Sequence, residues 1–385
     1  MHHQRHHFQL PDEIHYLNGA YMSPLMKSVE EAGIEGMRQK RNPSVITPAD
    51  FFEESKTVRA RFAQIINSKP EQIAIIPSVS YGLASAMRNL HIDSGQTAIV
   101  VGDEFPSDYY AAESWCRDND KGIQVIKAPE TTEHRGERWN QAILESINAD
   151  TAVVVLSSIH WTDGTRFDLK AIGQRCREVN ARFVVDGTQS VGVMLVDVAA
   201  FHIDALICAG YKWLLGPYSI GVAYYGEYFD HGRPIEEAWV NRSNAVNFSA
   251  LTQYAEEYTP AAGRYNAGEY GNFILIPMLS ASLKQILEWD VANISAYCSS
   301  LTQPLATWLR DNGYVVEDDQ YRSPHIMGVG MPPSMDMDVV IRELQERKIF
   351  VSRRGKAIRV SAHVYNTQKD IDAMKDALSA LRKSS

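Results

Sequence analysis

The sequence predicts an α/β fold, in which a mainly parallel sheet forms a large domain and a smaller α+β domain follows at the C-terminal end. Short runs rich in β-branched residues alternate with helical stretches, which is the pattern of strands joined by helical crossovers. The runs are continuously apolar, as expected where helices cover both faces of a sheet. The predicted strands of the large domain lie at 72–76, 98–101, 125–126, 152–156, 183–186 and 206–209, with a last one ending at 224.

Length and composition set the class of protein. A chain of 385 residues usually forms one large and one smaller domain, and we place a tail at 1–15, the large domain at 16–272 and the small domain at 273–385. The formal net charge of -9 gives no support to nucleic-acid binding, and no apolar run approaches the length of a membrane span.

The cysteines and the N-terminus indicate the compartment. The four cysteines are scattered without the spacing of metal ligands, so we expect no metal site. The histidines within residues 2–7 favour a disordered polar terminus over a metal site, and no secretory signal follows them. Together these features predict a cytoplasmic protein.

The first part of the chain contains a candidate phosphate site. Helical stretches are predicted at 25–38 and 49–66, the second with one apolar side. After strand 72–76, a turn of small residues and a helix aim backbone N–H groups and hydroxyls at one point, where a helix N-terminus favours negative charge. Val79 and Ser80 are the candidates there, and an ordinary serine N-cap is the alternative.

Polar residues follow two later strands, at the edge where open α/β sheets bind ligands. Asp108, after strand 98–101, either turns inward or faces solvent with its loop. His160, after strand 152–156, is either a general base or a histidine bonded to the backbone of its loop. Polar helices at 139–147 and 168–179 complete the alternation of strands and helices.

Asp186 and Lys212 follow two neighbouring predicted strands and point to one cofactor. A lysine amine forms a Schiff base with the aldehyde of pyridoxal phosphate (PLP), whose ring nitrogen needs an acidic partner. A carboxylate such as Asp186 keeps that nitrogen protonated, because a nearby opposite charge favours the charged form. An aspartate in a turn and a lysine with its amine in solvent are the structural alternatives.

The C-terminal part is expected to form a separate small domain. The helix at 274–289 is a candidate hinge into it, and strands are predicted at 314–316 and 325–329. Its last stretch, at 350–367, contains Arg359 on a strand.

At these residues the chain resembles the class V aminotransferases of PLP fold type I, which include cysteine desulfurases, selenocysteine lyases, kynureninases and isopenicillin N epimerase-like proteins. The resemblance extends from Tyr16-Leu17-Asn18 to Arg359-Val360-Ser361. It implies a PLP-dependent transferase fold, pyridoxal 5'-phosphate as cofactor and a homodimer with shared active sites.

The resemblance also implies roles for single residues around the cofactor. Lys212 is the Schiff-base lysine, Asp186 the partner of the ring nitrogen, and Gln189 the residue that bonds the ring's phenolic oxygen. Phe105, in a Phe-Pro-Ser-Asp segment close to the Phe-Pro-Thr-Asp of kynureninases, stacks on the ring, with Asp108 near the reacting amine. The resemblance assigns the phosphate of PLP to Val79, Ser80 and Tyr211. It assigns the phosphate of the partner subunit's PLP to Gly268 and Glu269.

On the substrate side, the resemblance assigns the α-carboxylate to the fork of Arg359. Asn18 and Ala20 match a segment that crosses the mouth of the site, with a plain turn as the alternative. Trp161 stands where the family often has an asparagine, which predicts an aromatic wall.

These residues predict a PLP enzyme acting on an α-amino acid, by transamination or by lyase chemistry at Cβ, with a kynureninase-like site. A cysteine desulfurase or selenocysteine lyase is the alternative, but it needs a nucleophilic cysteine ahead of Arg359, and residues 346–358 contain none. A second alternative is a PLP-binding protein that has lost its catalytic role.

Overall fold

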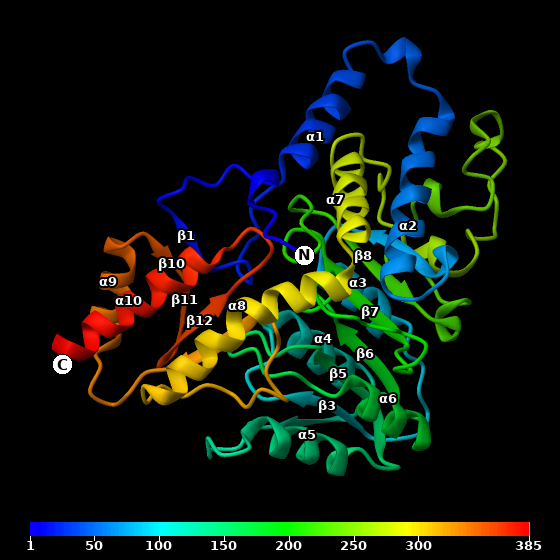
Figure 1. Cartoon of the computed structure of the whole chain (residues 1–385). Helices are drawn as coiled ribbons and strands as arrows, with labels where there is room; N and C mark the ends of the chain where they lie inside the picture. Colours follow the sequence, from blue (N-terminus) through cyan, green and yellow to red (C-terminus); the bar gives the residue numbers. More distant parts are fainter. Residues whose placement is uncertain (385) are drawn as a thin grey trace.

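The computed structural model describes residues 1–384 and is built around a seven-stranded sheet (Figure 1). The strand order is β2-β8-β7-β6-β5-β3-β4, in which β8 runs antiparallel to both neighbours and all other pairs are parallel. This order confirms the predicted α/β fold with mainly parallel strands. The strands are β2 Ile73–Ile76, β3 Thr97–Val101, β4 Gly122–Ile126, β5 Thr151–Ser157, β6 Arg182–Asp186, β7 Ala205–Ala209 and β8 Gly221–Tyr225.

Helices bury both faces of this sheet, which explains why its central strands are apolar at every position. Along β5, Val153 and Val155 enter one core while Val154 and Leu156 enter the other. The first core also takes apolar residues of α3 and α4, and the second takes those of α2, α5, α6 and α7. The helices are α1 Lys27–Gln39, α2 Glu53–Ile65, α3 Val79–Arg88, α4 Pro106–Asp118, α5 Arg135–Ser146, α6 Leu169–Glu178 and α7 Leu275–Trp289.

A smaller unit follows α7 and has its own apolar core. The chain turns at Asp290, whose φ is +67° and whose carboxylate accepts the N–H of Ala292 at 2.7 Å, and α8 then leads into this unit, drawn in orange and red in Figure 1. Its sheet has the antiparallel order β11-β12-β9. The elements are α8 Val291–Asp311, β9 Ile326–Gly330, α9 Met337–Glu346, β10 Ile349–Phe350, β11 Ser352–Arg354, β12 Ala357–Ser361 and α10 Gln368–Ser384.

The prediction of a strand at 314–316 is wrong. Val315 makes only an isolated bridge to Gly330. The chain leaves β9 at once because the Glu317 carboxylate bonds across to α5, accepting the N–H of Gly136 at 3.1 Å and pairing with Arg135 at 3.2 Å.

The N-terminal segment packs on the smaller unit, so the prediction of a disordered terminus is wrong for residues 4–7. Gln4 donates its N–H to Val364 at 2.6 Å, and Phe8 is buried. Strand β1 (His15–Tyr16) pairs in parallel with β10, as the dark blue chain beside β10 shows in Figure 1. Within residues 1–384, no group of His, Cys, Asp and Glu gathers as metal ligands would, and no helix is long and apolar enough to cross a membrane.

Candidate active site

The ends of five strands bring the candidate residues to one edge of the sheet. β3, β5, β6 and β7 are parallel, and β2 points the same way because its two antiparallel steps through β8 restore its direction. The segments after these strands enclose a cavity of about 320 Å³, a size that suits a small ligand. Of the predicted site residues, it is lined by Val79, Ser80, Phe105, Trp161, Asp186, Gln189, Tyr211 and Lys212.

Lys212 lies buried in a turn after β7. Gly216 donates its N–H to Gly210 at 2.8 Å and Leu215 donates to Lys212 at 3.1 Å, which closes the turn with Leu215 at a φ of +54°. Burial lowers the pKa of Lys212 to about 8, with Asp186 opposing this shift and Arg359 adding to it. The amine is therefore partly neutral, and so nucleophilic, near physiological pH.

Asp186 and Asp108 form a pair of buried carboxylates. Asp186 ends β6 and accepts the N–H of Thr188 at 2.8 Å, whereas the Asp108 carboxyl faces that of Asp186 and accepts no N–H group from the described residues. Burial raises the pKa of both, and the negative charge of Asp186 raises that of Asp108 further. Asp108 thus turns inward, and the alternative of a solvent-facing side chain is wrong.

Two neighbours fix the orientation of the Gln189 amide. Its Oε1 accepts the indole N–H of Trp213 at 2.8 Å, and its Nε2 donates to the carbonyl of Ala20 at 3.3 Å. The carbonyl of Gln189 lies 2.7 Å from Nε2 of His325, whose burial lowers its pKa to about 3. These contacts leave the Gln189 amide presenting a donor, as a phenolate oxygen requires.

Asn18 and Ala20 lie outside the lining of the cavity. The Oδ1 of Asn18 accepts the hydroxyl of Ser352 at 2.7 Å, and the N–H of Ala20 donates to the hydroxyl of Ser361 at 3.0 Å. Both groups are thus engaged within the protein, and a contact with substrate stays a prediction.

Aromatic rings flank the Lys212 amine. The ring centres of Phe105 and Tyr211 each lie 5.7 Å from Nζ. Glu104, which the sequence analysis did not select, positions Phe105. Its buried carboxylate accepts the N–H groups of Phe105 and Ser157, both at 2.8 Å, and so ties the end of β3 to that of β5. The available signal was a charged residue directly before Phe-Pro.

The turn after β2 combines a serine cap with the predicted phosphate site. Ser78 caps α3 by accepting the N–H of Tyr81 at 3.2 Å, and its hydroxyl lies 3.0 Å from that of Ser80. The N-cap alternative therefore holds for Ser78. Val79 and Ser80 form the first turn of α3 at the cavity wall, where the helix dipole favours an anion.

Arg359 of β12 contacts Trp161, a residue of the cavity wall, without lining the cavity itself. It is buried, and its Nη1 donates to the carbonyl of Trp161 at 2.5 Å. No carboxylate of the described residues lies within ion-pair distance of it, and burial lowers its pKa to about 9. Trp161 is held by its indole N–H, which donates to Asp103 at 2.8 Å, and packs edge-on against Phe105.

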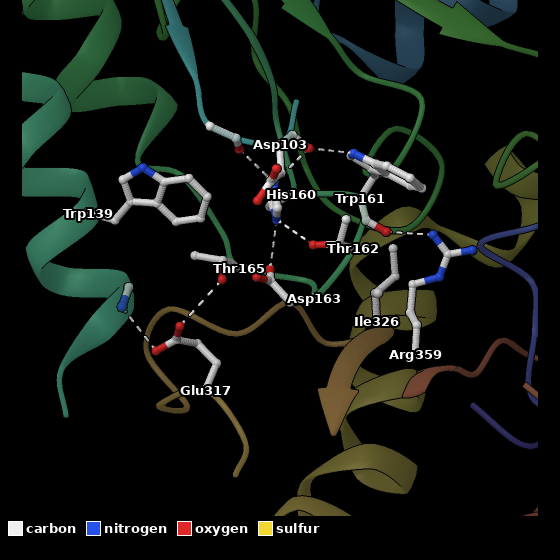
Figure 2. A network of polar contacts seen from close by, with 12 residues as sticks. Asp103, Trp139, His160, Trp161, Thr162, Asp163, Thr165, Glu317, Ile326 and Arg359 are labelled. Atoms are coloured by element: carbon white, nitrogen blue, oxygen red, sulfur yellow. Dashed lines mark hydrogen bonds and ion pairs between the residues drawn. The ribbon is translucent and has the colours of Figure 1, made fainter. Parts of the chain in front are cut away.

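His160 belongs to a structural network behind this wall (Figure 2). Its Nε2 lies 3.2 Å from the carbonyls of Gly102 and Asp103, and its Nδ1 is 3.1 Å from Asp163, which pairs with Arg135 at 2.9 Å. Burial disfavours the charged imidazole, but Asp163 outweighs it and raises the pKa of His160. The ring contacts side chains of its own loop and the backbone of the loop after β3 rather than the cavity, which favours a structural role over that of a general base.

Gly268 and Glu269 lie away from the cavity of their own chain. The N–H of Gly268 donates to Glu236 at 2.5 Å, and Glu236 also accepts the hydroxyl of Tyr81 at 2.8 Å. Glu269 is exposed, has a φ of +57° and does not line the cavity of its own chain. Their contact with a partner subunit stays a prediction.

The fold is similar to that of several solved structures. The chain superposes on the apo structure of a cysteine desulfurase from Thermococcus onnurineus NA1 with a TM-score of 0.82, at 19% identity and over 100% of this chain and 99% of that one. A complex of the cystine C-S lyase C-DES with cysteine persulfide gives a TM-score of 0.83, at 17% identity and over 96% and 98% of the two chains. A mutant of C-DES carries glycine covalently linked to its PLP cofactor.

The curated relatives are named for several different activities. An uncharacterized aminotransferase, YcbU, of Bacillus subtilis is 24% identical over 86% of this chain and 85% of its own length. A probable cysteine desulfurase of Methanothermobacter thermautotrophicus is 24% identical over 83% and 82%, and a kynureninase of Deinococcus radiodurans is 26% identical over 78% and 72%.

The residues of the cavity fit PLP. Asp186 lines the cavity as a buried carboxylate that a protonated ring nitrogen would satisfy, Asp108 lies buried next to it, and a lysine of lowered pKa lies beside them. The family model described as aminotransferase class-V matches residues 45–374. The chain therefore belongs to the class V aminotransferase family and is a PLP-dependent enzyme.

Proposed function

We propose that this enzyme removes the Cα proton of an α-amino acid, as the first step of transamination or of cleavage at Cβ. The observation that carries the proposal is the cavity that Lys212 and Asp186 both line, with Asp108 and Arg359 near enough for their charges to act on the Lys212 amine. PLP supplies the electron sink for this chemistry.

Each residue has a distinct task in this proposal. Arg359 binds the α-carboxylate with its fork, because its buried guanidinium has no carboxylate partner among residues 1–384. Lys212 binds the cofactor and, once released, moves the Cα proton, since its lowered pKa makes the amine a base near neutral pH. Asp186 holds the ring nitrogen in its protonated form, with Asp108 buried beside it, while Gln189 donates to the phenolic oxygen.

The second candidate, a cysteine desulfurase, is favoured by the desulfurase relative but not by the position of the thiols. All four cysteines are buried, and burial raises the pKa of each thiol whose shift is resolved. The last of them, Cys298, lies in α8, and the hairpin ahead of Arg359 has no thiol to take up sulfur.

The test is exchange of the Cα hydrogen in D₂O, followed by mass spectrometry for each common amino acid. We expect exchange with at least one amino acid in the wild type and none in Lys212→Ala. Product analysis for the keto acid, alanine or sulfide then separates transamination from cleavage at Cβ. If the wild type, with its cofactor bound, exchanges none of the amino acids, the proposal fails.

We also propose a homodimer in which Gly268 and Glu269 contribute to the partner's phosphate site. The support is their position outside the cavity of their own chain, together with Tyr218, which lines the cavity yet is 64% exposed. Light scattering is expected to give twice the chain mass, and a monomer with full turnover would contradict the shared site.

A further inference from the structure

A second arginine lies beside Arg359 on the same face of the small-domain hairpin. In the register of β11 and β12, Ser352 pairs with Arg359 and Arg354 pairs with Ala357. Because side chains alternate along a strand, Arg354 and Arg359 are diagonal neighbours on one face, about 7–8 Å apart, with their Cβ atoms somewhat closer. Arg353 points to the other face, where it pairs with Asp338 at 2.5 Å.

Both guanidinium groups meet the same tryptophan. Arg359 donates to the Trp161 carbonyl, whereas the guanidinium carbon of Arg354 lies 5.1 Å from the centre of the Trp161 ring. Trp161 lines the cavity, and the charges of both arginines help to lower the pKa of Lys212, so both guanidinium groups lie near the Lys212 side of that wall.

Neither charge is neutralised by the protein. Among the residues that the structure describes, no carboxylate forms an ion pair with Arg354 or Arg359, and the Nε of each is buried without a partner. Burial lowers the pKa of both, and Arg354 lowers that of Arg359 further, so each feels the charge of the other. A buried and a half-buried like charge without a counter-ion are costly, and bound anions would reduce that cost.

On the basis of the proposed function, we propose that Arg354 binds a second carboxylate, and that the substrate is an α-amino acid whose side chain ends in an acidic group. Arg359 holds the α-carboxylate, and the diagonal spacing gives the side-chain carboxylate its own fork at Arg354. The Trp161 ring holds the guanidinium of Arg354 on this face through the cation–π contact.

The direct test is calorimetry of the holoenzyme with succinate, glutarate and adipate, each against the monocarboxylate of the same carbon number. We expect at least one dicarboxylate to bind about 10-fold tighter or more than its partner, as a charge-assisted contact implies. Arg354→Gln should abolish that preference and leave the monocarboxylate within about 3-fold, while Arg354→Lys should retain part of it. The matched control is Arg353→Gln, which removes an arginine from the opposite face and should change neither affinity.

Two results would overturn the proposal. One is a wild type that binds mono- and dicarboxylates equally, a comparison that needs no variant to fold. The other is equal weakening of both ligands in Arg354→Gln, which would place Arg354 on the α-carboxylate together with Arg359. Because calorimetry requires no turnover, a missing dicarboxylate preference contradicts the second subsite, whereas missing Cα exchange contradicts the proposed function.

Discussion

The Lys212 amine is expected to titrate far below an ordinary lysine in the cofactor-free protein. Its pKa is lowered from 10.5 to about 8, chiefly because burial removes water from the ammonium group. At pH 7 this leaves about one tenth of the amine neutral, about 300-fold more than for a lysine with the ordinary pKa. Asp186→Asn removes the strongest charge that favours the ammonium form, so the titration of Lys212 should move to still lower pH.

Competitive labelling measures this directly. The apoprotein is treated with limiting acetic anhydride from pH 6 to 11, and mass spectrometry gives the labelling of Lys212 relative to the exposed Lys56. The pH of half-maximal labelling reports the pKa whatever the accessibility of the amine. A midpoint near 10.5, or a rise of the midpoint in Asp186→Asn, would refute the argument from burial and charge.

Three further outcomes follow from the structure. Asp186→Asn should lower turnover by about 10- to 100-fold, the worth of a hydrogen bond to a charged group, and near-normal steady-state rates would count against its role. Replacing all four cysteines should leave turnover largely intact. A persulfide on the protein, seen by mass spectrometry with cysteine as substrate, would instead favour a cysteine desulfurase. Gly36→Ala would put Cβ 1.9 Å from the Phe273 carbonyl, so calorimetric melting should show a loss of about 1–3 kcal/mol or more, whereas Gly122→Ala, with its closest contact at 3.7 Å, should lose less.

The central sheet and the Lys212–Asp186 pair could be predicted because their signals are local. Apolar runs that end in a polar residue are visible in sequence, and parallel strands bring those ends to one edge. The direction of Asp108 could not be predicted from its loop. It depends on α4 beginning at Pro106 and packing on the sheet, which turns the first helical turn inward.

Arg354 and Glu104 show why the other features of the site could not be predicted from the sequence. Charged residues in short loops and strands are usually solvated, so sequence alone places them at the surface. Glu104 is buried only because two N–H groups from different strand ends converge on it. Arg354 is placed beside Arg359 only by the register of the hairpin. The prediction of a strand at 314–316 was wrong for the same reason, because the contact of Glu317 with α5 is long-range.

The most direct test of the account is to locate the cofactor. The purified holoenzyme is reduced with borohydride, digested and sequenced by mass spectrometry. We expect the yellow colour to bleach and one phosphopyridoxyl group to appear, on the peptide containing Lys212. A label on another lysine, or a protein that binds no PLP, would contradict the assignment of the active site.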